Sequence, residues 1–320
     1  MNRFLKKTLH FNLVIEFIAS IFMFRAYSRQ ILKYSGISWN NNMIRSLLFY
    51  VLFFSTGCKE SASFEFSVYW WKHKTDISTE QEQFIADNKI KSIYLKLFDL
   101  KWDAYNKKII IPKTHSAIKT SVEVKAVIYI ENDILKNYSA DTIATIIHQQ
   151  LDIAIEKDII NNINDLQIDC DWTISTREAY FELLELISQQ IPNLSATIRL
   201  HQVKYAEVTG VPPIDKGVLM IYNLESPADT SVTNSIFNYD LAIQYLEGHI
   251  KKYPLHLDIA LPAFSWGVHF HHGRIKQLIS DFDPNQIDSS DMVQKENGYF
   301  KAKQAHFYNT YRISNRDEIR

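Results

Sequence analysis

Glycine and cysteine are both rare in this chain, which has 320 residues but only 8 glycines and 2 cysteines. So few glycines argue against a close backbone approach to a cofactor, and the sequence contains no Gly-rich phosphate loop. Cys170 stands inside an apolar run, where the expected role is that of a small buried side chain. We therefore predict that the chain uses no cofactor.

An excess of charge of one sign is also lacking. Lys and Arg number 35 against 36 Asp and Glu, so the formal net charge is -1. Proteins that bind nucleic acids usually carry a basic patch or stripe, and none appears here, so we predict no nucleic-acid partner. The length allows one large domain or two small ones.

The most informative run is Gln167–Trp172, which reads Gln-Ile-Asp-Cys-Asp-Trp and predicts a buried strand that ends in two acids. Side chains alternate along a strand, so Asp169 and Asp171 share one face while Cys170 and Trp172 share the other. Trp172 is then expected to pack outward under the helix that follows. Two carboxylates about 7 Å apart repel each other, so one is expected to hold its proton near neutral pH.

Strand-like and helix-like segments alternate from residue 64 onward, and capping-box patterns at Ser78–Gln81 and Ser175–Glu178 mark two helix starts. This alternation predicts a parallel sheet with right-handed crossovers. Seven such repeats favour an α/β fold of the (β/α)8 TIM-barrel type over an open doubly wound sheet. The predicted strands are 64–71, 91–99, 124–130, 166–171, 196–200, 217–222 and 255–261, and the main predicted helices are 141–160, 179–190, 204–209 and 239–251.

An eighth β/α unit is not readable in the sequence. Residues 280–297 are polar, and residues 298–313 read as strand-like. A barrel without its last strand exposes two unpaired edges, which soluble proteins avoid. We therefore expect either an atypical closure or a barrel domain, residues 59–320, that is incomplete at its C-terminus, and we favour the second.

Residues 43–58 have the features of a secretory signal, because Arg45 precedes the apolar run 46–54 and small residues follow. The Ser-Thr-Gly-Cys ending resembles a bacterial lipobox, with Ser55 at the position where Leu is usual. It implies a lipid on Cys58 and a membrane-anchored place in the cell envelope, facing the periplasm or the cell surface. The alternative is a buried apolar segment of the fold. Residues 1–42 are then a spurious or unstructured leader, and N-terminal analysis of the native protein that found residues before Met43 would contradict this.

Aromatic and polar side chains follow several predicted strands, at the rim where β/α barrels bind ligands. Flat aromatic rings can cover the apolar faces of sugars, although large core residues are the alternative for each. An Arg paired with a barrel carboxylate is as often structural as it is a substrate contact. The candidate substrate-binding residues are Trp70, Trp102, Arg199, His201, Gln202, Asn223 and Trp266.

A histidine cluster follows the seventh predicted strand. His269 and His271 would face one way on an extended chain, which is a spacing that metal sites use. The sequence identifies no further ligands, so we expect solvated or hydrogen-bonded histidines in a loop and predict no metal.

Three short motifs resemble family-18 glycoside hydrolases: Gln167–Trp172, Met220–Asn223 and Ile259–Phe264. The resemblance extends over residues 64–273 and is closest to an uncharacterised group of bacterial β/α-barrel lipoproteins. It implies a barrel whose fourth strand presents catalytic acids to a glycan.

Within that resemblance, Asp169 and Asp171 match the last two acids of the family motif, and Tyr222 matches the sixth-strand tyrosine. Asn223 stands where an aspartate is usual, and Thr173 stands where the family has its catalytic glutamate. Threonine cannot supply a proton near pH 7. The resemblance therefore assigns catalysis to Asp169, Asp171 and Tyr222, with Asp171 as the proton donor; Asp103 and Glu225 are weaker alternatives.

The sequence thus predicts a lipid-anchored, glycoside-hydrolase-like barrel that binds a polysaccharide, and it leaves open whether the glycan is hydrolysed. The alternative is a non-catalytic envelope or assembly lipoprotein that uses the barrel as a scaffold. Metal-dependent hydrolysis through the histidine cluster is a third, weaker hypothesis.

Overall fold

The computed structural model describes residues 64–71, 77–112, 117–295 and 298–320. Every element described below lies within the unit Glu65–Arg320. The predicted signal segment 43–58, the lipidation site Cys58 and the leader 1–42 lie outside the described residues, so they stay predictions. Within the described ranges, no helix has the length and apolar character needed to cross a membrane.

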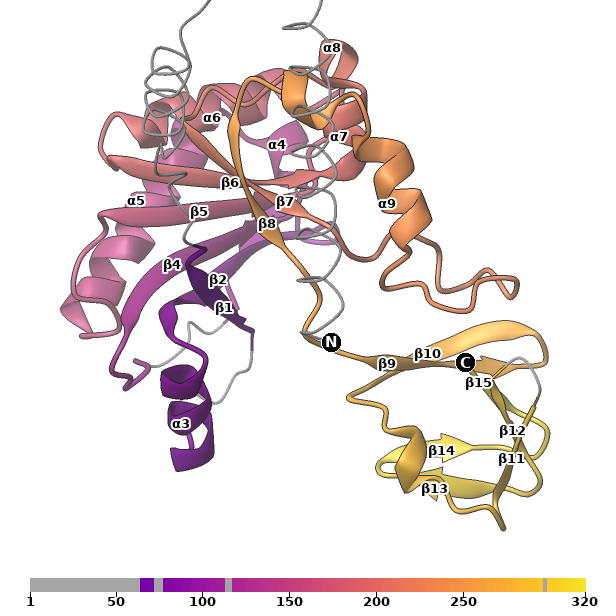
Figure 1. Ribbon diagram of the computed structural model, residues 1–320. Helices are drawn as coiled ribbons and strands as arrows, with labels where there is room; N and C mark the ends of the chain where they lie inside the picture. The colour runs from indigo at the N-terminus through magenta and orange to yellow at the C-terminus, as the bar shows by residue number, and fades with distance from the viewer. Residues whose placement is uncertain (1–63, 72–76, 113–116, 296–297) are drawn as a thin grey trace, which may run out of the picture. The chain divides into compact units, whose positions relative to one another are not determined.

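The main sheet consists of parallel strands in the order in which they occur along the chain, as expected for a β/α barrel (Figure 1). Helices follow most of the strands and cover one face of the sheet. The fold is therefore an incomplete (β/α)8-type barrel. Its parallel strands are β1 (Phe66–Trp70), β2 (Ile90–Asp103), β4 (Glu123–Ile130), β5 (Asp165–Cys170), β6 (Asn193–Arg199), β7 (Lys216–Met220) and β8 (His256–Ala260). The helices are α3 (Thr79–Asp87), α4 (Ile134–Asn137), α5 (Ala140–Glu156), α6 (Arg177–Ser188), α7 (Leu200–Lys204), α8 (Ala206–Thr209) and α9 (Tyr239–Leu246), with short 3₁₀ turns η1 (Ile250–Lys252) and η2 (Pro284–Gln286).

The predicted strands are found, with ends shifted by a few residues in most cases. β2 is longer than predicted. The chain turns back after β2, and the short antiparallel strand β3 (Lys108–Ile110) pairs with the end of β2. β5 ends at Cys170, so Asp171 lies just beyond it. Cys170 is a buried free thiol, as predicted.

Strand alternation divides the sheet into an apolar and a polar face. Ile168 and Cys170 lie on the apolar face and belong to the main hydrophobic core. Trp172 lies on the same face, where it packs against Tyr180 and Phe181 of α6. The prediction that Trp172 packs outward under a helix is confirmed.

The sheet is strongly curled. The Tyr69 hydroxyl on β1 donates a hydrogen bond of 2.7 Å to Oε1 of Gln167 on β5. In a flat sheet these strands would lie three spacings, or about 14 Å, apart. The bond therefore crosses the concave face of a half-barrel.

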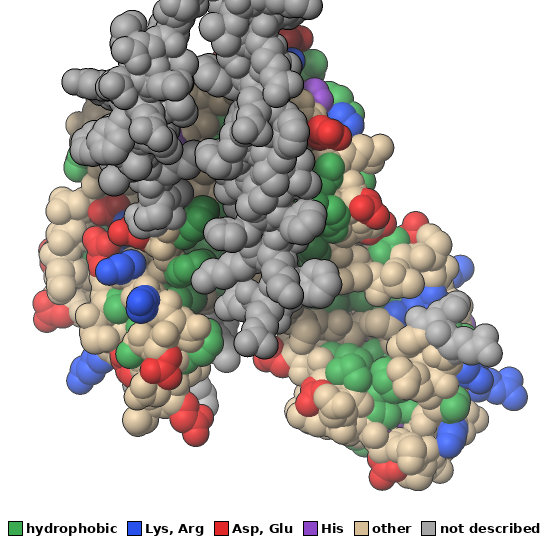
Figure 2. All heavy atoms as spheres, in the orientation of Figure 1, with side chains coloured by type: hydrophobic (Ala, Val, Ile, Leu, Met, Phe, Trp, Pro, Cys, Tyr) green, Lys and Arg blue, Asp and Glu red, His purple; other side chains and the backbone are tan. Residues whose placement is uncertain are grey.

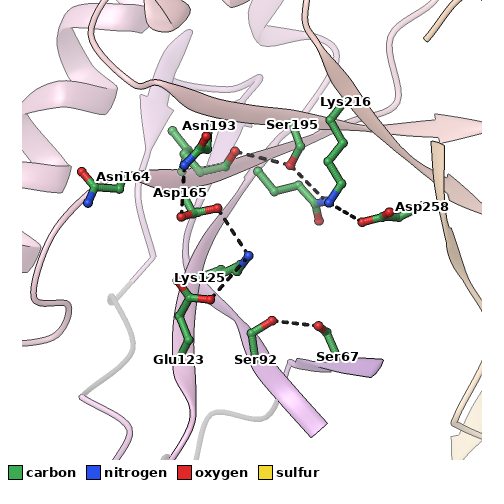
Figure 3. Close-up of polar contacts among 12 residues, drawn as sticks. Ser67, Ser92, Glu123, Lys125, Asn164, Asp165, Asn193, Ser195, Lys216 and Asp258 are labelled. Atoms are coloured by element: carbon green, nitrogen blue, oxygen red, sulfur yellow. Dashed lines mark hydrogen bonds and ion pairs between the residues drawn. The ribbon is translucent and has the colours of Figure 1, made fainter. Parts of the chain in front are cut away.

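Polar contacts link side chains in the amino-terminal half of this concave face (Figure 3). Lys125 pairs with Glu123 and Asp165, and Lys216 pairs with Asp258. Several of these side chains remain partly exposed. Because a packed barrel interior is usually apolar, this lining indicates a concave face that water reaches.

The start of α6 differs from its prediction. Its N-cap is Thr176, which makes no capping hydrogen bond, so the predicted capping box with Ser175 as N-cap is wrong. The Thr176 hydroxyl is buried, accepts from the N–H of Thr173 at 2.9 Å, and donates to Asn132 at 2.6 Å. A contact to a residue 44 positions away thus replaced the local cap. The other predicted capping box, Ser78–Gln81, is confirmed at α3.

After β8 the described chain forms antiparallel sheet instead of an eighth parallel unit. β9 (Trp266–His271) and β10 (Arg274–Ser280) make a hairpin, and the last strand pairs with β9. The predicted histidine loop is therefore wrong, because His269 and His271 lie on strand β9. The remaining strands are β11 (Met292–Gln294), β12 (Phe300–Ala302), β13 (His306–Tyr308), β14 (Tyr311–Ile313) and β15 (Glu318–Ile319).

Candidate functional site

Two aspartates at the carboxyl end of β5 occupy different environments on the concave face. Asp169 is partly buried and accepts a hydrogen bond of 2.8 Å from the hydroxyl of Thr197 on β6. Burial, with a smaller contribution from the neighbouring charge of Asp171, raises the pKa of Asp169 to about 6, against the lowering effects of that hydrogen bond and of Arg199. Asp171 is more exposed and forms an ion pair with Arg199. The two carboxyls, two residues apart, thus lie in different electrostatic environments.

The sequence predicts Asp171 as the proton donor, and this role stays a prediction; the carboxyl whose pKa is raised in the structure is that of Asp169. The reason is that β5 carries Asp169 deeper into the concave face, where losing water disfavours the charged form. Asp171 lies just beyond the strand and meets the guanidinium of Arg199.

Three tyrosines surround this pair. Burial, together with the negative charges of Asp169 and Asp171, raises the pKa values of Tyr129 and Tyr222 to about 12, and for Tyr222 this holds against the lowering effect of Arg199. Burial also raises the pKa of Tyr69, to which Asp169 adds a smaller raising effect. All three phenols therefore stay protonated at neutral pH; the Tyr69 hydroxyl donates to Gln167 and the Tyr222 hydroxyl to the sulfur of Met220.

A cavity of about 220 Å³ opens at the carboxyl ends of β6 and β7. Arg199, His201, Tyr222 and Asn223 line it, together with Tyr245 of α9. Four sequence-predicted site residues are thus brought to one place. The cavity is smaller than the pockets that hold drug-sized ligands, which start at about 300 Å³, so it suits one small polar group or a single ring.

The turn after β7 positions the Asn223 side of this cavity. Asn223 has a φ of 55°, in the left-handed region that asparagine tolerates better than most residues. Its N–H donates to the carbonyl of Ile236, which ties the loop back to the strand end. Partial burial and the charge of Arg199 lower the pKa of His201, which also lines the cavity, against the raising effect of Asp171.

Other predicted substrate-binding residues lie elsewhere. Trp70 and Trp102 pack against the main core on the face opposite to Asp169. Gln202 is 1% exposed, and its side-chain oxygen accepts from the N–H of Arg199, so it supports the start of α7. Their predicted contact with substrate is untested, and this placement favours structural roles for all three.

Trp266 lies on β9, where its indole N–H donates to Ser235 at 3.2 Å. Its ring centroid is 5.3 Å from that of Phe264, which in turn lies 5.9 Å from Tyr222. Trp266 is thus linked to the cavity through a second aromatic side chain. It also lines a smaller cavity of about 70 Å³ beside residues 227–236.

Several concave-face residues are not among the site residues predicted from the sequence. Trp71 is 41% exposed and stacks on Tyr69 with a centroid separation of 5.5 Å. The ammonium of Lys96 lies 5.5 Å from the Trp71 ring and contacts Asp99. Alternation along β1 and β2 contained the signal for these side chains, but only strand register shows that they face the β5 acids.

The histidine cluster makes hydrogen bonds within the C-terminal sheet. Nε2 of His269 and Nδ1 of His271 lie 2.7 and 2.6 Å from the two oxygens of Asp317. Across the described residues, no group of three or more His, Cys, Asp or Glu side chains is placed to hold a metal ion.

Acidic and basic side chains are both distributed over the face shown in space-filling form (Figure 2). The described part of that face therefore shows neither a broad basic patch nor a broad acidic one, which agrees with the near-zero net charge.

No protein-family model and no curated protein sequence matches this chain. Among solved structures, a monomeric β-xylosidase from Caulobacter crescentus CB15 matches with a TM-score of 0.33 and 8% identity, over 62% of this chain and 51% of that one. A GH39 β-xylosidase from Caulobacter crescentus matches with a TM-score of 0.31 and 9% identity, over 62% and 53%. The chain thus spans about half the length of these structures. The barrel assignment itself comes from the strand order and the parallel pairing.

Proposed function

We propose that this protein binds a polysaccharide at the carboxyl ends of its barrel strands and hydrolyses a glycosidic bond there. The observation that carries the proposal is the pair Asp169 and Asp171, in which burial favours a proton on one carboxyl while Arg199 pairs with the other. Two carboxyls with unlike environments are the usual equipment of glycoside hydrolysis.

In this proposal Asp169 donates its proton to the glycosidic oxygen as the bond breaks. A pKa of about 6 leaves a useful fraction protonated near neutral pH and still allows transfer. The ion-paired carboxylate of Asp171 stabilises the positive charge that develops on the sugar ring. Tyr222 can donate a hydrogen bond to a sugar oxygen, and the exposed ring of Trp71 offers an apolar surface for stacking.

The resemblance to family-18 glycoside hydrolases supports the same substrate class but a different acid. Thr173 occupies the position of the family's glutamate, and it lies in the turn between β5 and α6, where its hydroxyl is 2.9 Å from that of Ser175. Thr173 has no carboxyl group, so we assign the role of the acid to Asp169.

The test incubates the purified full chain with a panel of polysaccharides and measures binding and new reducing ends together. Asp171→Asn is expected to lower cleavage by about 10²-fold, because it removes charge stabilisation in the transition state. Asp152→Asn, at an exposed position on α5, is the matched control and should cleave like the wild type. Neither binding nor cleavage from a folded sample would reject the proposal and favour the non-catalytic scaffold.

A further inference from the structure

We infer that Asp99 is a third catalytic carboxylate of this site, beside Asp169 and Asp171, and is the base that takes a proton from the attacking water. The inference rests on the function proposed above and adds the residue and the stereochemistry that the sequence left open. Asp99 lies on β2, four residues before the end of that strand.

Strand register places Asp99 and Asp169 in one row of the sheet. Asp99 pairs with Tyr129 of β4, and Tyr129 pairs with Asp169 of β5. Residues in register on neighbouring parallel strands point to the same face, so all three side chains share the concave face. A carboxyl thus stands on each side of the Tyr129 phenol.

The spacing of this row suits one reaction geometry. Two strand spacings separate the backbones of Asp99 and Asp169 by roughly 10 Å. The strong curl of the sheet, seen in the bond between Tyr69 and Gln167, brings concave-face side chains closer together than that. Inverting glycosidases hold their carboxyls about 6.5–9.5 Å apart, to admit a water, whereas retaining enzymes need about 5–5.5 Å. The row therefore favours inversion.

The charges around Asp99 suit a base. Its carboxylate lies 3.1 Å from the ammonium of Lys96 and 3.6 Å from that of Lys101, and its side chain is 13% exposed. Two ammonium groups thus flank this mostly covered carboxylate and hold it on the concave face. Among the described residues Asp169 has no ion pair of this kind, and burial raises its pKa to about 6. The two carboxyls of the row thus lie in unlike surroundings, as those of an acid and a base do.

The step balances without any further reactant. Asp169 gives its proton to the glycosidic oxygen while the bond from that oxygen to the anomeric carbon breaks. The oxygen of a water bonds to the anomeric carbon from the opposite side, and the proton it loses passes to Asp99. Exchange with solvent then returns each carboxyl to its starting state, and the new hemiacetal has inverted configuration.

The experiment measures kcat, KM and product configuration for the full chain and for Asp99 variants. Asp99→Asn is expected to lower kcat by about 10³-fold with KM little changed, because base catalysis contributes about 10² to 10⁴. Asp99→Ala is expected to regain cleavage when azide is added, with a glycosyl azide of inverted configuration as product. Glu123→Gln is the matched control, since Glu123 also forms a concave-face ion pair but at the amino end of the sheet, and its kcat should not change.

Several other results would overturn the role of Asp99 as the catalytic base. Full cleavage by Asp99→Asn, or a wild-type product of retained configuration, overturns the inference while the proposed function stands. Loss of both kcat and thermal stability without azide rescue assigns Asp99 to a structural ion pair and also overturns it. If the wild type binds glycan but never cleaves it, hydrolysis and this inference fall together and glycan binding remains.

Discussion

Asp169→Asn is expected to make the protein more stable at pH 8, by up to about 3 kcal/mol, while reducing glycan cleavage at least 10²-fold. Burial raises the pKa of Asp169 to about 6, against about 3.9 in an unfolded chain, and each unit of difference corresponds to about 1.4 kcal/mol. Above that pKa the folded protein must hold a charged carboxylate in a site that disfavours it. Asparagine keeps the shape, can still accept from Thr197 and carries no charge, but it has no proton to donate.

The direction of the Asp169 pKa shift determines how the stabilisation by Asp169→Asn depends on pH. Because the folded pKa is raised, the contribution of Asp169 to wild-type stability is full below about pH 4 and is lost as the pH rises through about 6. The stability gap between variant and wild type should therefore be small near pH 4 and reach its full size above pH 7. Urea unfolding at pH 4.5, 6 and 8 measures it, with Asp152→Asn as the control. A gap that did not change with pH would contradict the assigned pKa.

Some features of this site can be predicted from the local sequence alone. Alternation in Gln167–Trp172 separates the two acids from Cys170 and Trp172, because the period of a strand is a local property. The same local logic predicted the order of β/α units and the capping box at Ser78. These features depend on residues that are neighbours along the chain.

Features that depend on distant residues could not be predicted. The register that aligns Asp99 with Asp169 is a property of three paired strands and leaves no signal in any one of them. The buried contact between Thr176 and Asn132 displaced the capping box predicted at Ser175 for the same reason. Depth within the curled sheet, which decides whether Asp169 or Asp171 keeps the proton, exists only once the strands have assembled.

Asp317→Ala is expected to destabilise the C-terminal sheet by about 3 kcal/mol at pH 7. Asp317 is 2% exposed and accepts from the N–H of Ser314 as well as from His269 and His271. His269 is 0% exposed, and its other ring nitrogen lies 3.1 Å from the amide nitrogen of Gln277. With Nε2 protonated and Nδ1 accepting from Gln277, the neutral ring is satisfied on both sides, and truncating Asp317 leaves a buried donor without its partner.

The wild-type cluster should also make the sheet sensitive to acid. Burial, with the nearby charges of Lys276 and His271, lowers the pKa of His269 against the raising effect of Asp317. Burial raises the pKa of Asp317, but the Ser314 N–H and both histidines outweigh it, so its pKa is lowered. A lowered folded pKa means that stability is present at high pH and lost as the pH falls, first below about 6.5 through His269 and then below about 4 through Asp317.

Thermal unfolding of wild type and Asp317→Ala between pH 4 and 8 measures both effects. Asp288→Ala is the matched control, since Asp288 also accepts a backbone N–H but in an exposed turn, and its loss should cost about 1 kcal/mol or less. The Asp317 variant should lie well below this control at pH 7, and the difference should persist down to about pH 4, because Asp317 holds its charge until then and raises the pKa of His269. Equal losses for the two variants at every pH would mean that the buried cluster contributes no more than a surface turn does.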